Sequence, residues 1–406
     1  MTLARLNHLY PTCQVLGKVL ITFLCAASLQ AVADEDVDLL DFYDDDETVS
    51  ISTGTNKPIR LAPSVATVIT EDDISRSGAK NLDQVLEAIP GVHVSVAKNN
   101  KLNSVYSIRG VHTARNAQVL VLIDDVPVRQ LYGGGRPSNF YLPVENIKRV
   151  EIVRGPGSAL YGADAFSGVI NVVTKGAVEI DGFRFGLRSG SFNSQDVWLQ
   201  YGTQLDSKWQ LALSLEHSKS DGDDGRIIER DFQSIFDDVF GSTASLAPGA
   251  LDTRFEVTNF RAGLRSENWD FSVVSWLQND AGLGNGVAQA LDPIGSVDVD
   301  YHVLSAAYSA DVSDTRSVSM KAWTSYYNEL DEAVILPPGS IIPIGDDGNL
   351  TLGGRLVSFP DGFIGNPGGR ERRYSLEAAT ILTGLPKHSF RLAAGLELQR
   401  GEVREE

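Results

Sequence analysis

The acidic segment Asp221-Gly222-Asp223-Asp224-Gly225 has the residue types of a calcium-binding loop. Calcium prefers carboxylate and carbonyl oxygens, and a helix–loop–helix calcium site spaces them over twelve residues that end in a glutamate. The twelve-residue pattern and its terminal glutamate are missing here. A solvated acidic loop is therefore the better interpretation, although a bound cation would order it.

The other residues with catalytic or ligating potential show no spacing that assembles a site. Gly155-Pro156-Gly157 lacks the G-x-x-x-x-G-K-[ST] spacing of a phosphate loop, and Gly133-Gly134-Gly135 lacks the strand-to-helix context of a dinucleotide site. We therefore expect no enzyme activity, no metal site and no cofactor. A secreted enzyme, as an alternative, would need a nucleophile or metal-ligand set that the sequence does not offer. The histidines are scattered without metal-site spacing at His93, His112, His217, His302 and His388.

Composition narrows the class of protein. The chain has 406 residues, a formal net charge of −18 and two cysteines, Cys13 and Cys25. The acidic balance argues against nucleic acid as a partner, because little positive charge is available to neutralise phosphates. No segment reaches the roughly 20 uninterrupted apolar residues of a spanning helix. A membrane protein of this sequence must therefore be a barrel.

Residues 1–33 have the pattern of a secretory signal. Arg5 and Lys18 precede an apolar run, and Ala31-Val32-Ala33 fits a cleavage site. Cleavage near Ala33 would remove both cysteines, so we expect no disulfide in the mature chain. A buried N-terminal helix is the alternative reading of this segment.

Residues 34–62 are predicted to be a flexible segment, and its first part, Asp34 to Glu47, is very acidic with too few apolar residues to fold alone. The segment contains a short β-prone stretch, Thr48-Val49-Ser50-Ile51-Ser52. Such a stretch on a flexible tether can add a strand to the sheet edge of a partner, since main-chain hydrogen bonds then supply the affinity.

The stretch from Ile147 to Lys175, IKRVEIVRGPGSALYGADAFSGVINVVTK, is the most specific motif of the chain. Two Val- and Ile-rich runs flank a glycine-rich turn, which predicts two strands joined by a sharp turn. This stretch resembles the end of the plug domain of TonB-dependent outer-membrane receptors. The resemblance rests on Arg154-Gly155-Pro156, Ser158-Ala159, Tyr161-Gly162, Gly168-Val169-Ile170-Asn171 and Thr174-Lys175.

Residues 63–176 as a whole follow the same resemblance and predict a compact α+β unit. A strand from Pro63 to Thr70 precedes a helical turn at Glu71 and an amphipathic helix from Asn81 to Ile89, with Asn81 as its cap. Strands are predicted at 92–96, 104–111 and 119–128. The sequence departs from the family pattern at Asp125, where glycine is common, although aspartate tolerates left-handed conformations.

Residues 183–406 alternate apolar and polar side chains in runs of about ten residues, as strands of a transmembrane barrel require. Short turns such as 206–208 and 267–268 alternate with long links at about 220–257, 280–300 and 329–370. A soluble sandwich is the alternative. Nine strands are predicted, at 183–191, 195–205, 209–219, 258–266, 269–278, 301–311, 315–328, 371–383 and 389–398. Nine strands cannot enclose a plug, so we expect an incomplete barrel within a longer protein or a truncated gene.

The resemblance also implies roles for individual residues. It places the TonB box, which the periplasmic partner TonB binds, at Glu47, Thr48, Val49, Ser50 and Ile51. It implies ligand contacts from loops between plug strands, for which the candidates are Lys98, Asn99, Asn100, Tyr132 and Arg136.

Arg109 and Arg154 each lie beside a glycine at a strand end in matching motifs. In a plug they would contact the barrel wall through ion pairs, with Glu377 and Glu397 as possible partners. The alternative is a surface arginine at each turn.

The resemblance therefore implies a receptor and active transporter in the cell outer membrane, surrounded by outer-membrane lipids. Its ligand would be a scarce nutrient complex, for which a ferric siderophore is the default and cobalamin, heme and carbohydrate stay open. The alternative is a passive surface protein or a transport-incompetent remnant.

Overall fold

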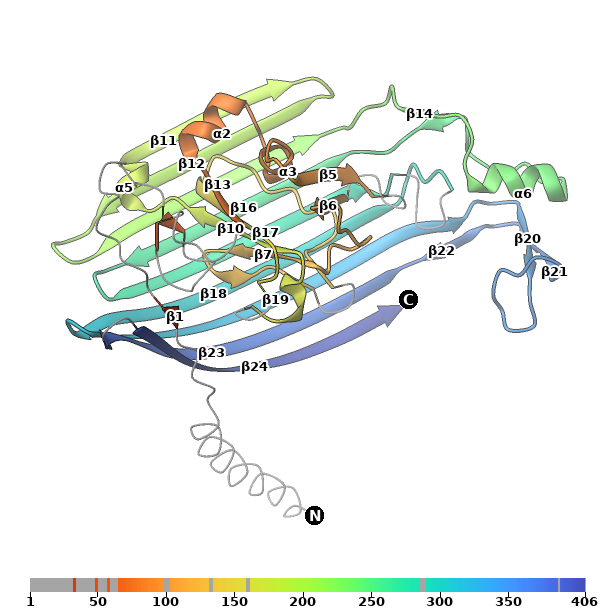
Figure 1. Cartoon of the computed structure of the whole chain (residues 1–406). Coiled ribbons are helices and arrows are strands. Elements are labelled where there is room, and N and C mark those ends of the chain that lie inside the picture. The colour runs from red at the N-terminus through yellow and green to blue at the C-terminus, as the bar shows by residue number, and fades with distance from the viewer. Residues whose placement is uncertain are drawn as a thin grey trace, which may run out of the picture.

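The computed structural model describes residues 32–33, 48–49, 57–58, 65–97, 103–130, 134–157, 161–284, 290–385 and 388–405. An N-terminal domain, residues 65–180, lies against one face of a broad antiparallel sheet, which we call the wall (Figure 1). Three two-residue strands come earlier in the chain: β1 (Val32–Ala33), β2 (Thr48–Val49) and β3 (Lys57–Pro58). β2 pairs with β3, and β1 pairs with the last strand of the wall.

The N-terminal domain is an α+β unit around a five-stranded sheet of order β4-β9-β10-β7-β8. Consecutive hydrophobic positions in the central strands are buried because helices and loops cover the sheet, as expected for strands with two covered faces. Its elements are β4 (Val65–Thr70), α2 (Glu71–Ser77), α3 (Leu82–Glu87), β5 (Val92–Val96), β6 (Ser104–Ile108), β7 (Val119–Ile123), β8 (Val126–Pro127), β9 (Ile147–Arg154), η2 (Ala163–Ala165), β10 (Gly168–Thr174) and α5 (Ala177–Ile180).

The helix predicted from Asn81 is α3. Asn81 has an extended backbone and its side-chain oxygen accepts a hydrogen bond from the Gln84 N–H at 3.0 Å. The apolar residues predicted for one face, Leu82, Val85, Leu86 and Ile89, are all buried in the core of the domain, although the helix ends at Glu87, before Ile89.

Replacing this cap tests how much the short helix depends on it. We expect Asn81→Ala to lower the free energy of unfolding by about 1 kcal/mol, because an N–H at the helix start loses its acceptor. The measurement is the urea midpoint of the detergent-solubilised protein. Asn81→Asp keeps an acceptor and should stay close to the parent protein, so an equal loss in both variants would contradict the capping role.

The turn between β7 and β8 is formed by Asp124 and Asp125, both in the left-handed region with φ of 48° and 62°. Two aspartates adopt this conformation because neighbours hold them. The Asn171 side chain accepts from the Asp125 N–H at 3.1 Å and donates to its carboxylate at 2.9 Å. The turn therefore forms with Asp125 where related sequences commonly have glycine.

The sheet has eleven strands, because the short strands β1 and β22 pair with β24 and β19. Its nine long strands form the wall, and each is antiparallel to the next long strand along the chain. This confirms the predicted fold class, an α+β domain followed by nine antiparallel strands of an unclosed barrel. β18 and β19 are longer than predicted. The strands are β11 (Gly182–Gly190), β12 (Ser194–Gln204), β13 (Gln210–Ser220), β16 (Phe255–Arg265), β17 (Trp269–Gly282), β18 (Ser296–Ser313), β19 (Arg316–Leu336), β23 (Pro367–Leu385) and β24 (His388–Glu405).

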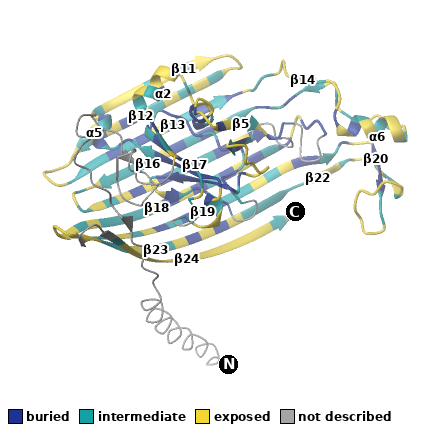
Figure 2. Cartoon of the chain, in the orientation of Figure 1, coloured by how far each residue is buried: buried dark blue, intermediate teal, exposed yellow. Residues whose placement is uncertain are grey.

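Burial alternates from residue to residue along strands of the wall (Figure 2). In β13, Ser214, Glu216 and Ser218 are buried on the inner face, which contacts the N-terminal domain, whereas Leu213 and Leu215 point to the other face. Polar residues inside and apolar residues outside are the pattern of a barrel wall in lipid.

The two rims of the wall differ. The short-turn rim consists of residues 205–209, 266–268, 314–315 and 386–387. The long-loop rim consists of the connections 191–193, 221–254, 283–295 and 337–366, which carry β14 (Ile227–Ile228), α6 (Phe232–Phe240), β15 (Gly249–Ala250), β20 (Ser340–Ile344), β21 (Arg355–Phe359) and β22 (Phe363–Gly365). Aromatic rings gather beside the short-turn rim, where Trp269 lies 5.4 Å from Phe271 and 4.9 Å from Tyr308.

Helix α5 joins the two bodies. Ala177 and Ile180 pack against Ala212 of the wall. A side chain at Gly202 would lie 2.6 Å from the Ala177 carbonyl oxygen, so glycine is required for this close approach. Among the described helices, none is long and apolar enough to cross a membrane.

Candidate functional site

The contact between the N-terminal domain and the inner face of the wall is the candidate functional site. The turn at Asp124 points at two wall strands. Arg261 of β16 forms an ion pair with the Asp124 carboxylate at 2.8 Å. Lys321 of β19 donates to the Asp124 main-chain carbonyl at 3.0 Å. One turn of the domain is thereby held from both sides.

The Arg261–Asp124 pair is largely removed from water, with side-chain exposures of 8% and 21%. Burial disfavours the charge of Asp124, but Arg261 and the hydrogen bonds from Thr174 outweigh it and lower the pKa of this carboxyl. Arg261 also donates to the Lys175 carbonyl at 3.1 Å. Asp124 therefore stays ionised at neutral pH, and Arg261 is the strongest of the groups that favour its charge.

An apolar cluster lies next to these charges. Trp276 of β17 is buried, its ring centroid is 5.0 Å from that of Phe140, and its indole N–H donates to the Tyr141 carbonyl at 2.9 Å. The Tyr141 ring stacks on Phe255 of β16 at 4.7 Å. This cluster contributes apolar burial, while the hydrogen bond fixes the register of the domain on the wall.

Other strands of the wall bind the domain through polar groups. Glu216 of β13 accepts from the Asn146 N–H at 3.1 Å. Arg188 of β11 pairs with Glu145 at 2.5 Å. Tyr301 of β18 donates to the Pro127 carbonyl at 3.0 Å. Water can replace each of these polar partners when the two surfaces separate. Apolar wall residues, among them Val257, Val274 and Tyr327, also belong to the buried cluster of the domain.

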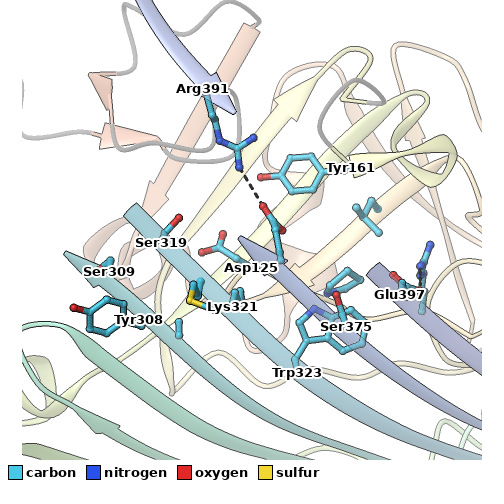
Figure 3. Close-up of a pocket in the computed structure, with 16 residues that line it drawn as sticks. Asp125, Tyr161, Tyr308, Ser309, Ser319, Lys321, Trp323, Ser375, Arg391 and Glu397 are labelled. Carbon is cyan, nitrogen blue, oxygen red and sulfur yellow. Dashed lines mark hydrogen bonds and ion pairs between the residues drawn. The ribbon is translucent and has the colours of Figure 1, made fainter. Parts of the chain in front are cut away.

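A cavity of about 390 Å³ lies between the domain and strands β18, β19, β23 and β24. Figure 3 shows Asp125 and Tyr161 facing wall residues that include Lys321. Burial raises the pKa of Asp125 and that of Tyr161. Arg391 and Glu377 form an ion pair at 3.2 Å at its edge. The lining therefore carries charges of both signs.

Arg109 and Arg154, which were predicted to contact the wall, have other neighbours in the structure. Arg154 donates to the Pro90 carbonyl and to the Thr67 hydroxyl, both inside the N-terminal domain. Arg109 is exposed at a turn with φ of 53°, and its N–H donates to the Gly91 carbonyl. Neither reaches the wall through these bonds, because their strand ends lie beside β4 and β5.

Glu397, one of the predicted partners, does contact the domain. Its carboxylate accepts from Arg129 at 2.5 Å, and Arg129 also pairs with Asp164. The other predicted partner, Glu377, pairs with Arg391 of the wall itself. A charged contact of the expected kind therefore exists, but a different arginine makes it.

Arg136, a predicted ligand contact, is a structural residue of the N-terminal domain. It is 4% exposed, donates to the Ser104 carbonyl at 2.8 Å and lies 4.7 Å from the Tyr106 ring centroid. Gly134 and Gly135, which precede it, have φ of 65° and 69°. The other predicted ligand contacts, Lys98, Asn99, Asn100 and Tyr132, lie outside the described residues.

The predicted partner-binding segment is described only in part. Thr48 and Val49 form β2 and pair with Pro58 and Lys57 of β3. Glu47, Ser50 and Ile51 lie outside the described residues.

The sequence analysis did not single out Asp124, Arg129, Glu216, Arg261 or Trp276. One signal was available, because charged residues on an otherwise alternating strand must face away from lipid. That rule marks Glu216 and Arg261 as inner-face residues without naming their partners. The described part of the chain contains no group of three or more His, Cys, Asp or Glu that could hold a metal ion.

Comparison with known proteins agrees with this geometry. Residues 58–169 match the family described as TonB-dependent Receptor Plug Domain. The vitamin B12 transporter BtuB of Vibrio vulnificus (strain CMCP6) is 36% identical over 146 residues, which are 36% of this chain and 23% of that protein.

Solved structures share the fold over most of the chain. The ferric preacinetobactin receptor BauA from Acinetobacter baumannii aligns with a TM-score of 0.61 and 17% identity, covering 88% of this chain and 50% of its own. The pyoverdine outer membrane receptor FpvA from Pseudomonas aeruginosa PAO1 aligns with a TM-score of 0.58 and 14% identity, covering 88% and 49%. The chain thus spans about half the length of these solved relatives.

Proposed function

We propose that this protein is a receptor and active transporter. The premise is that residues 58–169 are a TonB-dependent receptor plug domain that lies on part of an outer-membrane barrel wall. The protein binds a scarce nutrient complex at the long-loop rim and releases it toward the periplasm. It resides in the cell outer membrane, with the apolar face of the wall against lipid. Residues 1–33 direct its export, with cleavage near Ala33.

The observation that carries this proposal is how the plug is held. Its polar contacts with the wall are ion pairs and hydrogen bonds, several of them to main-chain carbonyls, and they lie beside a buried apolar contact that includes Trp276, Tyr301 and Tyr327 of the wall. A domain held in this way is specific in its position, yet water can take over its polar contacts when it moves. That suits a plug that must rearrange during each transport cycle.

Energy for the movement comes from TonB in the periplasm, which pulls on the segment Glu47 to Ile51. Thr48 and Val49 already have strand geometry, which supports recognition by strand addition. Their pairing with β3 would be exchanged for pairing with TonB.

The ligand is a metal-chelate nutrient, with a ferric siderophore as the first candidate. Solved relatives are receptors for ferric preacinetobactin and pyoverdine, and one relative by sequence is a vitamin B12 transporter. Another solved relative is a copper transporter.

Uptake of radioactive iron by a Gram-negative host that lacks its own siderophore receptors tests the proposal. Cells that express the protein and receive a set of ferric siderophores and labelled cobalamin should accumulate at least one label about tenfold above control cells. Accumulation should disappear in a TonB-deficient host or with a proton uncoupler, while binding at the cell surface persists. Insertion and surface binding with no TonB-dependent accumulation would instead favour a passive surface protein.

A further inference from the structure

The two rims of the wall carry different charge. The connections of the long-loop rim contain twelve Asp or Glu and four Lys or Arg, whereas the short-turn rim contains three acidic and two basic residues. A rim with such an excess of one sign produces a potential that attracts oppositely charged solutes and repels those of its own sign.

Two of the four basic side chains of the long-loop rim are paired with neighbouring carboxylates. Arg230 pairs with Asp238. Arg254 pairs with Asp252 and, at 2.8 Å, with Asp280. These two arginines are therefore neutralised locally and offer little to an anionic ligand.

A row of polar residues lies below this rim, where the N-terminal domain meets the inner face. The strand register aligns Gln278 of β17 with Val299 of β18, and Val299 with Glu329 of β19. The Ser138 hydroxyl donates to one Glu329 oxygen at 3.1 Å, which places residues 138 and 139 of the domain over this row. Asp331 follows two residues later on the same face of β19.

Buried atoms of this row lack hydrogen-bond partners among the described residues. Gln278 is 0% exposed and Asn139 is 6% exposed, and neither amide makes a hydrogen bond through its nitrogen or its oxygen. The second oxygen of Glu329 and one oxygen of Asp331 are also buried and unpartnered. Arg115 of the domain attracts both carboxyl groups, whereas Glu329 and Asp298 repel the charge of Asp331. The row therefore favours a proton or a cation over an anion and can accept further hydrogen bonds.

We propose that this end of the inner face, at Gln278, Glu329 and Asp331, selects ligands that carry a positive charge, such as a nutrient chelate with a protonated amine. The rim attracts the cation, and the two carboxylates accept hydrogen bonds from its N–H groups. The inference rests on the proposed receptor function and adds the charge of the ligand, which excludes anionic chelates as preferred cargo.

A thiol placed at the row measures its charge without any knowledge of the ligand or of transport. In a background with Cys13→Ser and Cys25→Ser, Ser138→Cys is the sole thiol. Two methanethiosulfonates are compared at this thiol, the cationic trimethylammonium-ethyl reagent and the anionic sulfonatoethyl reagent. The ratio of the cationic to the anionic reaction rate should be about tenfold above the same ratio for a free thiol in solution. Glu329→Gln with Asp331→Asn should bring the ratio close to the free-thiol value.

Two controls belong to this measurement. Asp206→Asn removes one charge at the short-turn rim, keeps the acceptor of that turn and should leave the ratio unchanged. Ser207→Cys at the same rim should give a ratio near that of the free thiol. Equal rates of the two reagents at Ser138→Cys would overturn the proposal, whatever the outcome of the uptake experiment.

Binding of matched chelates then tests selectivity. Three ferric trihydroxamates with one iron-binding core are compared by tryptophan quenching: one with a free amine, one acetylated and one succinylated. Affinity should fall about tenfold or more from the cationic to the anionic form, and 0.5 M salt should shrink the difference. The proposal would be overturned if the succinylated chelate bound most tightly, or if calcium were required for that chelate to bind. If none of the three chelates binds, the ratio of reagent rates at Ser138→Cys alone tests the proposal.

Discussion

Val49→Pro should abolish productive binding of the TonB C-terminal domain and, with it, energised uptake. Proline has no N–H, and its ring fixes φ, so it removes a main-chain donor from a strand that binds through its backbone. Val49 lies in β2, where its backbone already pairs with Lys57. Loss of one main-chain hydrogen bond at about 1 kcal/mol corresponds to roughly fivefold weaker binding, and the fixed φ of proline weakens it further.

The measurement is the affinity of purified TonB C-terminal domain for the full protein, together with uptake in cells. Val49→Ala is the matched control, because it shortens the side chain and keeps the N–H. Binding of the nutrient at the outer surface should be the same in all three proteins. Equal TonB affinity for Val49→Pro and the parent protein would show that the box lies elsewhere, and no affinity for either would favour a passive protein.

Arg261→Ala should have the largest effect on stability. It leaves Asp124 largely buried without its wall partner, and removal of one member of a buried ion pair typically costs about 3–5 kcal/mol. The expected result is a lower urea midpoint, together with faster hydrogen exchange of the β7 amides, because the turn at Asp124 loses its hold on β16.

The stability lost in Arg261→Ala should depend on pH. Burial raises the pKa of Asp124, but Arg261 and Thr174 outweigh it and lower the pKa in the folded protein. A lowered folded-state pKa contributes stability that is present above the ordinary carboxyl pKa of about 4 and is lost as the pH falls. The difference between the parent protein and Arg261→Ala should therefore be largest near pH 7 and shrink below about pH 4.

Two further variants separate this ion pair from general damage. Arg265 lies on the same strand and pairs with Asp270, but the side chains are 59% and 36% exposed. Arg265→Ala should therefore change stability by less than about 1 kcal/mol. The double variant Asp124→Asn with Arg261→Ala removes both charges and should recover part of the loss. Equal losses at Arg261 and Arg265 would contradict a special role for the buried pair.

Local patterns predicted the elements of the N-terminal domain because each depends on near neighbours in the sequence. Asn81 caps α3 through the Gln84 N–H three residues away, and the apolar face of that helix is buried as its periodicity indicated. The alternating runs after residue 183 predicted nine wall strands for the same reason, since alternate residues of a strand face opposite sides.

Local patterns could not predict which side chains of the domain and the wall pair with each other. The sequence predicted that arginines of the domain contact wall glutamates, yet Arg129 rather than Arg154 reaches Glu397, which is 268 residues away in the chain. Arg136, flanked by glycines, looked like an exposed loop residue and is buried on the Tyr106 ring. Neither outcome has a local signature, because it depends on where strands distant in sequence come to lie.

The sequence by itself therefore determined the type of each segment: a plug-like α+β domain, alternating wall strands, short turns on one rim and long acidic loops on the other. Only the tertiary structure decided which charges meet, because hydrogen bonds and ion pairs act over a few ångströms and need one specific register. It placed Arg261 and Lys321 on the turn at Asp124 and left Gln278, Glu329 and Asp331 with unpartnered buried atoms. Energy coupling and ligand selection, as proposed here, depend on those placements.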